Sequence, residues 1–204
     1  MALITDYATL VTEVQSYLAV SNLATWVPNF LQNSQNKLYR ALRIRPMEAA
    51  LSVTIASGVA ALPADYLDLK YAYVNSSPIK FLIRDTPENL LTSYPTRSSS
   101  GKPTVIAREA GNFIFGPYPD STYAIAGIYY KQLTLLSASN TTNWFTTNAP
   151  EVLLYGALLE AQPFIMNDER IQVWQAMFDE AIATITNQEK REKYSGSTPR
   201  MRNG

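Results

Sequence analysis

The residues of this chain that could do acid–base chemistry are carboxylates and tyrosines, because its 204 residues include no His and no Cys. This composition excludes Ser-His-Asp and Cys-His catalysis, and metal sites built on imidazole or thiolate. Paired carboxylates can hydrolyse glycosides, and four stand near turns of the middle region: Asp65, Asp68, Glu109 and Asp120. Because Asp favours turns and caps for structural reasons, we interpret them as turn residues. We predict no catalytic residue, no cofactor and no metal ligand.

Two further sets of residues admit a chemical interpretation. Glu160 lies on a mostly apolar helix ten residues before Arg170, and we predict an ion pair between them rather than a general acid. Lys131 is nearly the only basic residue beside a group of strand tyrosines, so packing of their rings is favoured over stacking on single-stranded nucleic acid. These tyrosines are Tyr118, Tyr123, Tyr129 and Tyr130.

The composition fits a globular protein with a sizeable core and a weakly charged surface. Hydrophobic residues make up 47% and charged residues 17%, below the usual quarter. Seventeen basic and seventeen acidic residues cancel, so the electrostatic footprint of a nucleic-acid or anionic-membrane binder is absent. No apolar run approaches the ~18–20 residues of a membrane span, and the N-terminus lacks a signal-peptide pattern. We therefore expect a soluble protein made in the cytoplasm.

The N-terminal and middle regions differ in the period of their apolar residues. Three-and-four spacing predicts a first helix capped by Thr5, and a second helix that starts near Pro28 and is stopped by Pro46. Alternating spacing then predicts about six short β segments, punctuated by Gly and Pro. The expected β segments are 51–55, 69–73, 79–83, 104–106, 113–115 and 123–130, with a short helix at 87–94.

The C-terminal region returns to helical spacing. Asn148 with Glu151 three residues later resembles a capping box, and Asn167 or Asp168 caps a second helix. Each amphipathic helix needs a partner for its apolar stripe, so we expect the N- and C-terminal helix pairs to pack together. The predicted core of this bundle includes Leu154, Leu158, Trp174 and Phe178.

These patterns predict an α+β fold with an inserted β-rich lobe and a flexible C-terminal tail. The helical bundle is expected to comprise residues 1–46 and 147–188, the lobe residues 47–146, and the tail residues 189–204. The tail has five basic and two acidic residues, hence a net charge of plus three. Both a solvated terminus and an arm that folds onto a partner remain open interpretations.

Three stretches of sequence combine into a family-like pattern. LPADYLDL (62–69) is followed by PDSTYAIAGIYY within 101–137, and by a helical hairpin, LLYGALLEAQPF to DERIQVW, within 149–182. This combination resembles the head–tail adaptor proteins of tailed bacteriophages, also called connector or tail tubular protein A-like proteins. The resemblance covers roughly residues 7–185.

The resemblance implies a structural virion protein rather than an enzyme. Such adaptors form a ring, typically of twelve copies, beneath the portal protein at the capsid–tail junction. The ring extends the channel through which DNA passes as cargo, and the tail nozzle or hub and the fibres or spikes dock on it. Assembly in the host cytoplasm and location in the virion, without a membrane, follow from this role.

The resemblance also implies a role for the tail, because the C-terminal segment of related adaptors inserts along the portal. By position, the corresponding residues here are Lys190, Arg191, Lys193, Tyr194, Pro199, Arg200, Met201 and Arg202.

Two alternative functions remain open beside the adaptor role. Another neck or tail-completion protein would have a similar helical core but would bind only the tail side. A carbohydrate-binding or carbohydrate-active module would instead use the β-rich lobe, with Asp120 and Tyr118 at its site.

Overall fold

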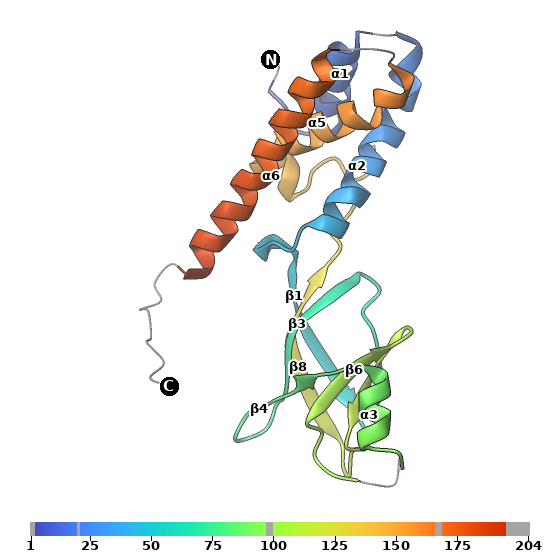
Figure 1. Cartoon of the computed structure of the whole chain (residues 1–204), viewed down its shortest axis with the longest axis vertical. Coiled ribbons are helices and arrows are strands. Elements are labelled where there is room, and N and C mark those ends of the chain that lie inside the picture. The colour runs from blue at the N-terminus through green and yellow to red at the C-terminus, as the bar shows by residue number, and fades with distance from the viewer. Residues whose placement is uncertain (1–2, 20, 97–99, 166–168, 195–204) are drawn as a thin grey trace. The chain divides into compact units, whose positions relative to one another are not determined.

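The computed structural model describes residues 3–19, 21–96, 100–165 and 169–194. Internal contacts divide the chain into two compact units: unit 1 comprises residues 1–46 and 133–204, and unit 2 comprises residues 47–132. Unit 1 is helical and unit 2 holds two four-stranded sheets, so the predicted α+β class is confirmed (Figure 1).

Residues 133–146 belong to unit 1, although we expected them in the β-rich lobe. Contacts that are distant in sequence tie this irregular segment to the helices. The Gln35 side chain accepts a hydrogen bond from the Leu136 backbone N–H (2.8 Å), and the Tyr7 N–H donates to the Thr141 carbonyl (2.7 Å). The segment therefore satisfies backbone and side-chain groups of the N-terminal helices.

The helices of unit 1 surround a central one. In chain order they are α1 (Tyr7–Leu18), α2 (Val27–Ala41), α4 (Trp144–Asn148), α5 (Pro150–Glu160) and α6 (Arg170–Tyr194), with 3-10 turns at Ser21–Trp26, Arg45–Met47 and Gln162–Phe164. Contacts join α5 to α1, α2, α4 and α6 (Figure 1). Buried residues occupy nearly every side of α5, so it is an interior helix rather than an amphipathic one.

A close approach of backbones holds α5 against α2. A Cβ added at Gly156 would lie 2.1 Å from the Ser34 hydroxyl oxygen and 3.2 Å from the Phe178 ring. Ser34 and Gln35 are themselves buried on α2. Small side chains at this crossing therefore permit the dense packing of the unit 1 core.

The N-terminal helices begin and end at residues other than those predicted. Asp6, not Thr5, caps α1: its carboxylate accepts from the Thr9 N–H (2.8 Å), and the Thr9 hydroxyl accepts from the Asp6 N–H (3.0 Å). These bonds to Thr9 lower the pKa of Asp6. α2 ends at Ala41, well before Pro46, because Arg43 donates to the carbonyls of Tyr39 and Leu42 at the helix end.

The predicted capping box at Asn148 is wrong as well. The box lies at Asn143, whose side chain accepts from the N–H groups of Phe145 and Thr146, while the Thr146 hydroxyl accepts from the Asn143 N–H. Asn148 ends this short helix α4 and donates to the Trp144 carbonyl (2.9 Å). The reciprocal Asn143–Thr146 pair thus starts α4, whereas α5 starts at Pro150 after Ala149 and has no side-chain cap.

The last helix extends beyond its predicted end at Gln188. α6 continues to Tyr194, so residues 189–194 of the expected tail are helical. The Arg45 N–H donates to the Glu189 carboxylate (2.9 Å), which fixes this part of α6 against the end of the first chain segment. The expected cap residues Asn167 and Asp168, and residues 195–204, lie outside the described part of the chain.

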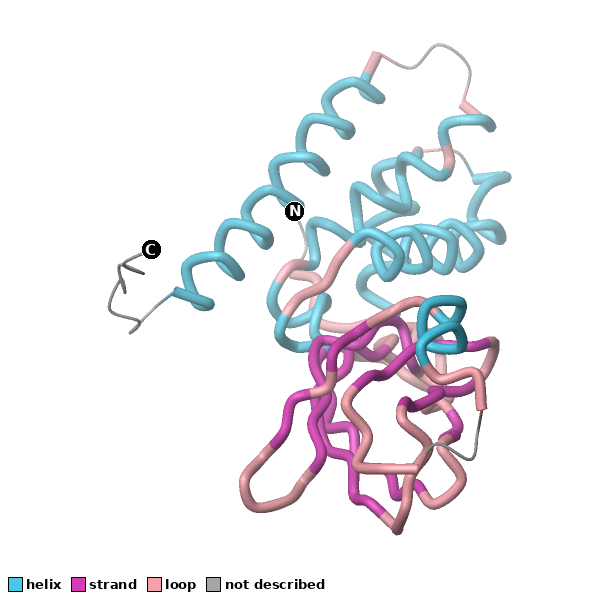
Figure 2. Tube along the Cα trace, turned by 60° about the horizontal axis from the view of Figure 1, so that its bottom comes forward, coloured by secondary structure: helices cyan, strands magenta, loops and turns pink. Residues whose placement is uncertain are grey.

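Unit 2 consists of two sheets and one short helix that packs on them. The sheet orders are β1-β8-β3-β4 and β2-β7-β6-β5, antiparallel except for the parallel β5–β6 pair. The elements are β1 (Glu48–Ile55), β2 (Val59–Ala61), β3 (Tyr66–Val74), β4 (Lys80–Phe81), β5 (Ile83–Arg84), α3 (Pro87–Ser93), β6 (Val105–Glu109), β7 (Asn112–Gly116) and β8 (Tyr123–Lys131). α3 lies against β6 and β7, beside the magenta strands of Figure 2.

The expected single strand at 79–83 is two strands in different sheets. The Leu82 N–H donates to the Ala72 carbonyl in the first sheet, and the Ile83 N–H donates to the Thr104 carbonyl beside the second. Leu82 is buried in the core of unit 2 at the crossing point. The backbone therefore passes at Leu82 from the edge of the first sheet, β4, to the edge of the second sheet, β5.

Candidate interaction surfaces

The carboxylates considered for catalysis serve local structure. Tyr129 is largely buried, and its burial together with its hydrogen bond to a carboxylate raises the pKa of the phenol. Within the described residues, no group of three or more His, Cys, Asp or Glu side chains is placed to hold a metal ion. The hydrogen-bonded pairs are Asp65–Tyr129 (2.9 Å), Asp68–Arg84 (2.8 Å) and Asp120–Tyr123 (2.6 Å), and Glu109 ends β6 opposite Asn112.

The predicted ion pair of Glu160 with Arg170 is wrong. Glu160 pairs with Lys37 of α2, which lies next to α5 in unit 1. The Arg170 guanidinium donates to the Tyr17 carbonyl (3.0 Å) and lies 5.1 Å from the centre of the Trp174 ring. Spacing along a hairpin did not predict these partners, because α5 packs against α2 and Arg170 bonds to the backbone of α1.

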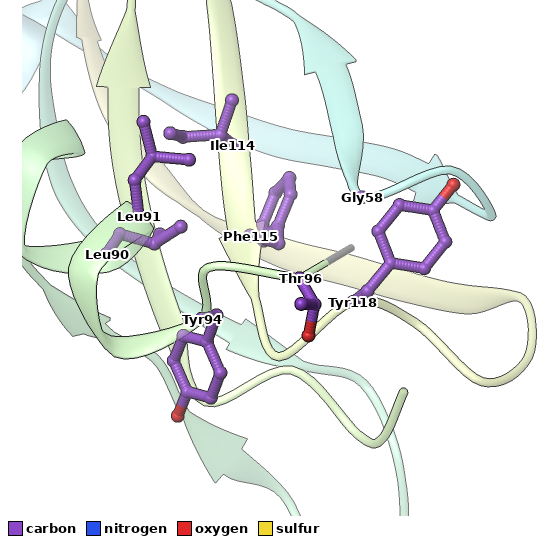
Figure 3. Close-up of a pocket in the computed structure, with 8 residues that line it drawn as sticks. All are labelled: Gly58, Leu90, Leu91, Tyr94, Thr96, Ile114, Phe115 and Tyr118. Carbon is purple, nitrogen blue, oxygen red and sulfur yellow. The ribbon is translucent and has the colours of Figure 1, made fainter. Parts of the chain in front are cut away.

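A small apolar pocket lies between α3 and β7 (Figure 3). Its volume is about 20 Å³, which holds roughly one water molecule. Two glycines let the rings of Tyr94 and Tyr118 close it: a Cβ at Gly116 would lie 2.5 Å from Tyr94, and one at Gly58 would lie 3.0 Å from Tyr118. A substrate the size of a sugar does not fit, and Tyr118 is part of this packing.

The most exposed apolar surface of unit 2 is an edge strip formed by Ile79, Phe81 and Ile83. Their exposed fractions are 58%, 64% and 67%. Alternate residues of an extended chain share a face, so the three side chains point outward while Leu82 points into the core. An apolar face of this kind, next to a sheet edge, is typical of a surface covered by another protein.

Two tyrosines of β3 extend the edge strip into an aromatic group. The ring of Phe81 lies 6.0 Å from that of Tyr71 and 5.7 Å from that of Tyr73, and Tyr71 is 40% exposed. The alternation in IKFLIR was the available signal for the strip, but the sequence did not indicate that its apolar face points to solvent. The tyrosines singled out from the sequence are not part of this group.

Besides Leu3 near the N-terminus, which is 81% exposed, the described residues of unit 1 include two pairs of exposed large apolar side chains. Trp26 and Phe164 stack with their ring centres 6.0 Å apart and are about half exposed, 48% and 53%. Val173 and Met177, one turn apart on α6, are 55% and 43% exposed. The opposite face of α6 is buried in the unit.

A cleft in unit 1 lies beside the last turns of α6; we call it the helix-end cleft. Its volume is about 320 Å³, and its walls include Arg45, Trp144, Ile185, Glu189 and Glu192. The Arg45 guanidinium lies 3.7 Å from the Glu192 carboxylate. Nothing in the sequence alone linked Arg45 to residues near the C-terminus.

The residues predicted for the bundle core and the portal-binding tail fall in different surroundings. Leu154, Leu158 and Trp174 are buried in unit 1, and Phe178 is half-buried. Lys190 and Arg191 are exposed on α6, and Lys193 and Tyr194 form its last residues. Pro199, Arg200, Met201 and Arg202 lie outside the described part of the chain.

The surfaces that stand out among the described residues are exposed apolar groups and a cleft lined by charged side chains, which are typical of proteins that bind other proteins. Residues 5–202 match the model of the family described as SU10 adaptor protein. The chain therefore belongs to this family of phage head–tail adaptors, and its role is that of a structural adaptor in the virion. A search of curated proteins gave no match. No helix within the described residues has the length and apolar character needed to span a membrane.

Proposed function

We propose that copies of the chain form a closed ring, of twelve subunits, beneath the portal of a phage capsid. The ring extends the DNA channel and provides the platform on which the tail nozzle or hub and the fibres or spikes dock. The observation that carries this proposal is the family match over residues 5–202. The ring forms in the host cytoplasm and stays at the capsid–tail junction.

The charge balance of the chain supports a channel role. Residues 47–132 have seven basic and seven acidic side chains, and the remainder of the chain has ten of each. A basic channel wall would retain DNA through release of its counterions. A protein that is neutral in both units allows DNA to pass without being held.

The exposed apolar residues of unit 2 support burial against other virion proteins. The three apolar residues of the edge strip are 58–67% exposed, although Leu82 between them is buried in the core. Exposed apolar patches rimmed by polar residues mark interaction sites. Lys80 and Arg84 provide such a polar rim.

The C-terminal segment is the part that we assign to the portal. Its helical part, 189–194, ends α6, and its remainder holds Pro199, Arg200, Met201 and Arg202. A basic terminal segment can cover a long surface groove of its partner. Positively charged and apolar residues then provide its anchors.

Sedimentation with the cognate portal ring tests the proposal. Three chains are compared: the full chain, one ending at Tyr194 and one ending at Gln188. A mass increase that matches about a dozen copies for the full chain, and is lost in the chain ending at Tyr194, supports portal binding by residues 195–204. Loss only in the chain ending at Gln188 moves the binding to the end of α6. No increase with the full chain contradicts the portal-bound ring.

The two alternatives are separated by a second pair of measurements. A tail-completion protein would bind isolated tail proteins and leave the portal mass unchanged. A carbohydrate-binding module would be retained by the sugars of a glycan array, and Asp120→Asn would abolish that binding. The portal-dependent mass increase, together with no retention of the full chain on the glycan array, is the expected result; binding of tail proteins without the mass increase would favour the tail-completion protein.

A further inference from the structure

The last turns of α6 carry opposite charges on opposite faces. Glu189 and Glu192 are three residues apart and share one face of the helix, which both turn toward Arg45. Lys190 and Arg191 lie between them in sequence and therefore on the opposite face, where both are exposed. The helix end thus presents an acidic face to the helix-end cleft and a basic face to solvent.

The helix-end cleft has the chemistry to receive a cationic side chain. The Trp144 ring forms part of its wall, Ile185 is buried at its base, and Asn148 is exposed at its border. Aromatic faces attract guanidinium and ammonium groups, and carboxylates bind them through charge-assisted hydrogen bonds. A volume of about 320 Å³ accommodates a long side chain.

The contacts within one chain leave the carboxylates of the cleft only partly compensated. Glu189 accepts from a backbone N–H of Arg45, which supplies no formal charge. The Arg45–Glu192 pair is long, at 3.7 Å, and its side chains are 56% and 43% exposed. Exposed pairs of this kind contribute little to stability. Two carboxylates therefore face a single guanidinium.

We infer that the basic face of one copy, Lys190 and Arg191, docks into the helix-end cleft of the next copy. A head-to-tail contact in a ring joins two different surfaces of the same chain, and these two faces are different surfaces on opposite sides of one helix. The charges are complementary: Lys190 and Arg191 carry two positive charges, and the two carboxylates of the cleft exceed the Arg45 charge by one. The inference rests on the proposed function, because it needs copies side by side in the ring.

This contact gives the helical and terminal parts of the C-terminal segment different partners. It narrows the portal contact proposed above for the whole segment: residues 189–194 join neighbouring copies, and only residues 195–204 remain for the portal. A reversal of charge on either face places like charges against each other, which weakens association by at least ~10-fold. Reversal on both faces restores the attraction with the signs exchanged.

The first test compares three full-length variants in the portal-binding assay. Lys190→Glu with Arg191→Glu, and Glu189→Lys with Glu192→Lys, are each expected to reduce the copies bound per portal, with the half-saturating concentration raised at least ~10-fold. The variant with all four changes is expected to recover the wild-type value. Failure of the fourfold variant to recover, with its helical content unchanged by circular dichroism, overturns the inference.

The second test uses the absence of Cys from the chain. Asn187→Cys marks the basic face without removing a charge, and Asn148→Cys marks the border of the cleft. A short bismaleimide crosslinks a mixture of the two single-cysteine chains only if the two faces of different copies meet. We expect crosslinked dimers in the mixture assembled on the portal, and none when Gln172→Cys, on a distant exposed part of α6, replaces Asn187→Cys.

The outcomes separate this inference from the proposed function. Wild-type chains that add no mass to the portal contradict the ring itself. Wild-type chains that add mass, but give no Asn187→Cys to Asn148→Cys crosslink, leave the ring intact and overturn only the assignment of the contact.

Discussion

Unit 1 and unit 2 use their apolar residues in different ways. In unit 1, the central helix α5 is buried on nearly every side, and the exposed large apolar side chains, such as Trp26 with Phe164 and Val173 with Met177, lie at separate places. In unit 2, Leu82 is buried while Ile79, Phe81 and Ile83 around it are 58–67% exposed. Unit 1 is therefore a scaffold built around a buried central helix, with its exposed apolar residues at separate places, whereas unit 2 exposes three neighbouring apolar residues in one strip.

The two units also differ in how a glycine brings elements together. In unit 2, a Cβ at Gly127 would lie 2.2 Å from the Tyr71 carbonyl oxygen and 2.8 Å from the Ala72 Cα, both backbone atoms. In unit 1, the obstacle to a Cβ at Gly156 is mainly the Ser34 side chain. Backbone in a sheet cannot move alone, whereas a hydroxyl can rotate.

Gly127→Ala is expected to have the largest effect, a loss of about 3 kcal/mol in the free energy of unfolding. The added methyl group must push β3 away from β8, and β3 pairs with β8 along its whole length. Hydrogen exchange is expected to speed up in these two strands. Gly111→Ala, which meets nothing within 4 Å, is the matched control and should change stability by less than ~0.5 kcal/mol. Unchanged protection of β3 and β8 would contradict the steric argument.

Leu82→Ala sharpens the contrast between core and edge strip. Leu82 is only 7% exposed, so its truncation is expected to cost about 2.5 kcal/mol through lost burial and the cavity left behind. Ile83→Ala, one residue later and 67% exposed, should cost less than ~0.5 kcal/mol in urea unfolding of the isolated chain. Ile83→Ala should instead reduce binding of tail proteins. Equal losses of stability for the two variants would show that the strip is part of the core.

Gly156→Ala tests the scaffold unit, with an expected loss of about 2 kcal/mol. All three tryptophans of the chain, Trp26, Trp144 and Trp174, are in unit 1, so tryptophan fluorescence reports its unfolding. A second change, Ser34→Gly, removes the obstructing hydroxyl and should recover part of the loss. If the double variant is no more stable than Gly156→Ala, then the contact with Phe178, 3.2 Å away, is the dominant one.

Tyr39→Phe has the smallest expected effect at neutral pH, a change within ~1 kcal/mol that favours the variant. The Tyr39 hydroxyl is buried and makes no hydrogen bond, and burial raises the pKa of Tyr39 to about 12 despite the opposing influence of Asn143. Because the folded-state pKa exceeds the unfolded value of 10.0, the wild type should lose stability as pH rises from 10 to 12. The variant should lack this component in urea unfolding measured at several pH values. Parallel pH profiles would contradict the assignment.

The sequence predicted elements well where local periodicity determined them. Helices at both ends, the short helix near Pro87 and most β segments follow from spacing and from Gly and Pro alone. Caps were less predictable, since Thr5 and Asp6 are both able to cap and only the reciprocal bond with Thr9 decides between them.

Features that depend on distant contacts were not predictable. The alternation at 79–83 indicated a strand, but the change of sheet at Leu82 depends on carbonyls of Ala72 and Thr104. The helical state of 189–194 is accompanied by the bond between Arg45 and Glu189, 144 residues apart. The helix-end cleft shares this property, because it combines residues 44–46, 144–148 and 185–192. The edge strip is continuous in sequence, but the aromatic group that extends it needs Tyr71 and Tyr73 of β3.

The crossing at Leu82 has a mechanical consequence. The N–H groups of the consecutive residues Leu82 and Ile83 donate to the carbonyls of Ala72 and Thr104. The same short piece of chain is therefore hydrogen-bonded to both sheets. A partner that pulls on the edge strip would strain the hydrogen bonds to Ala72 and to Thr104 at the same time, so the strip would not separate from one sheet before the other. A force applied to the edge strip by an attached protein would therefore be shared by the two sheets of unit 2.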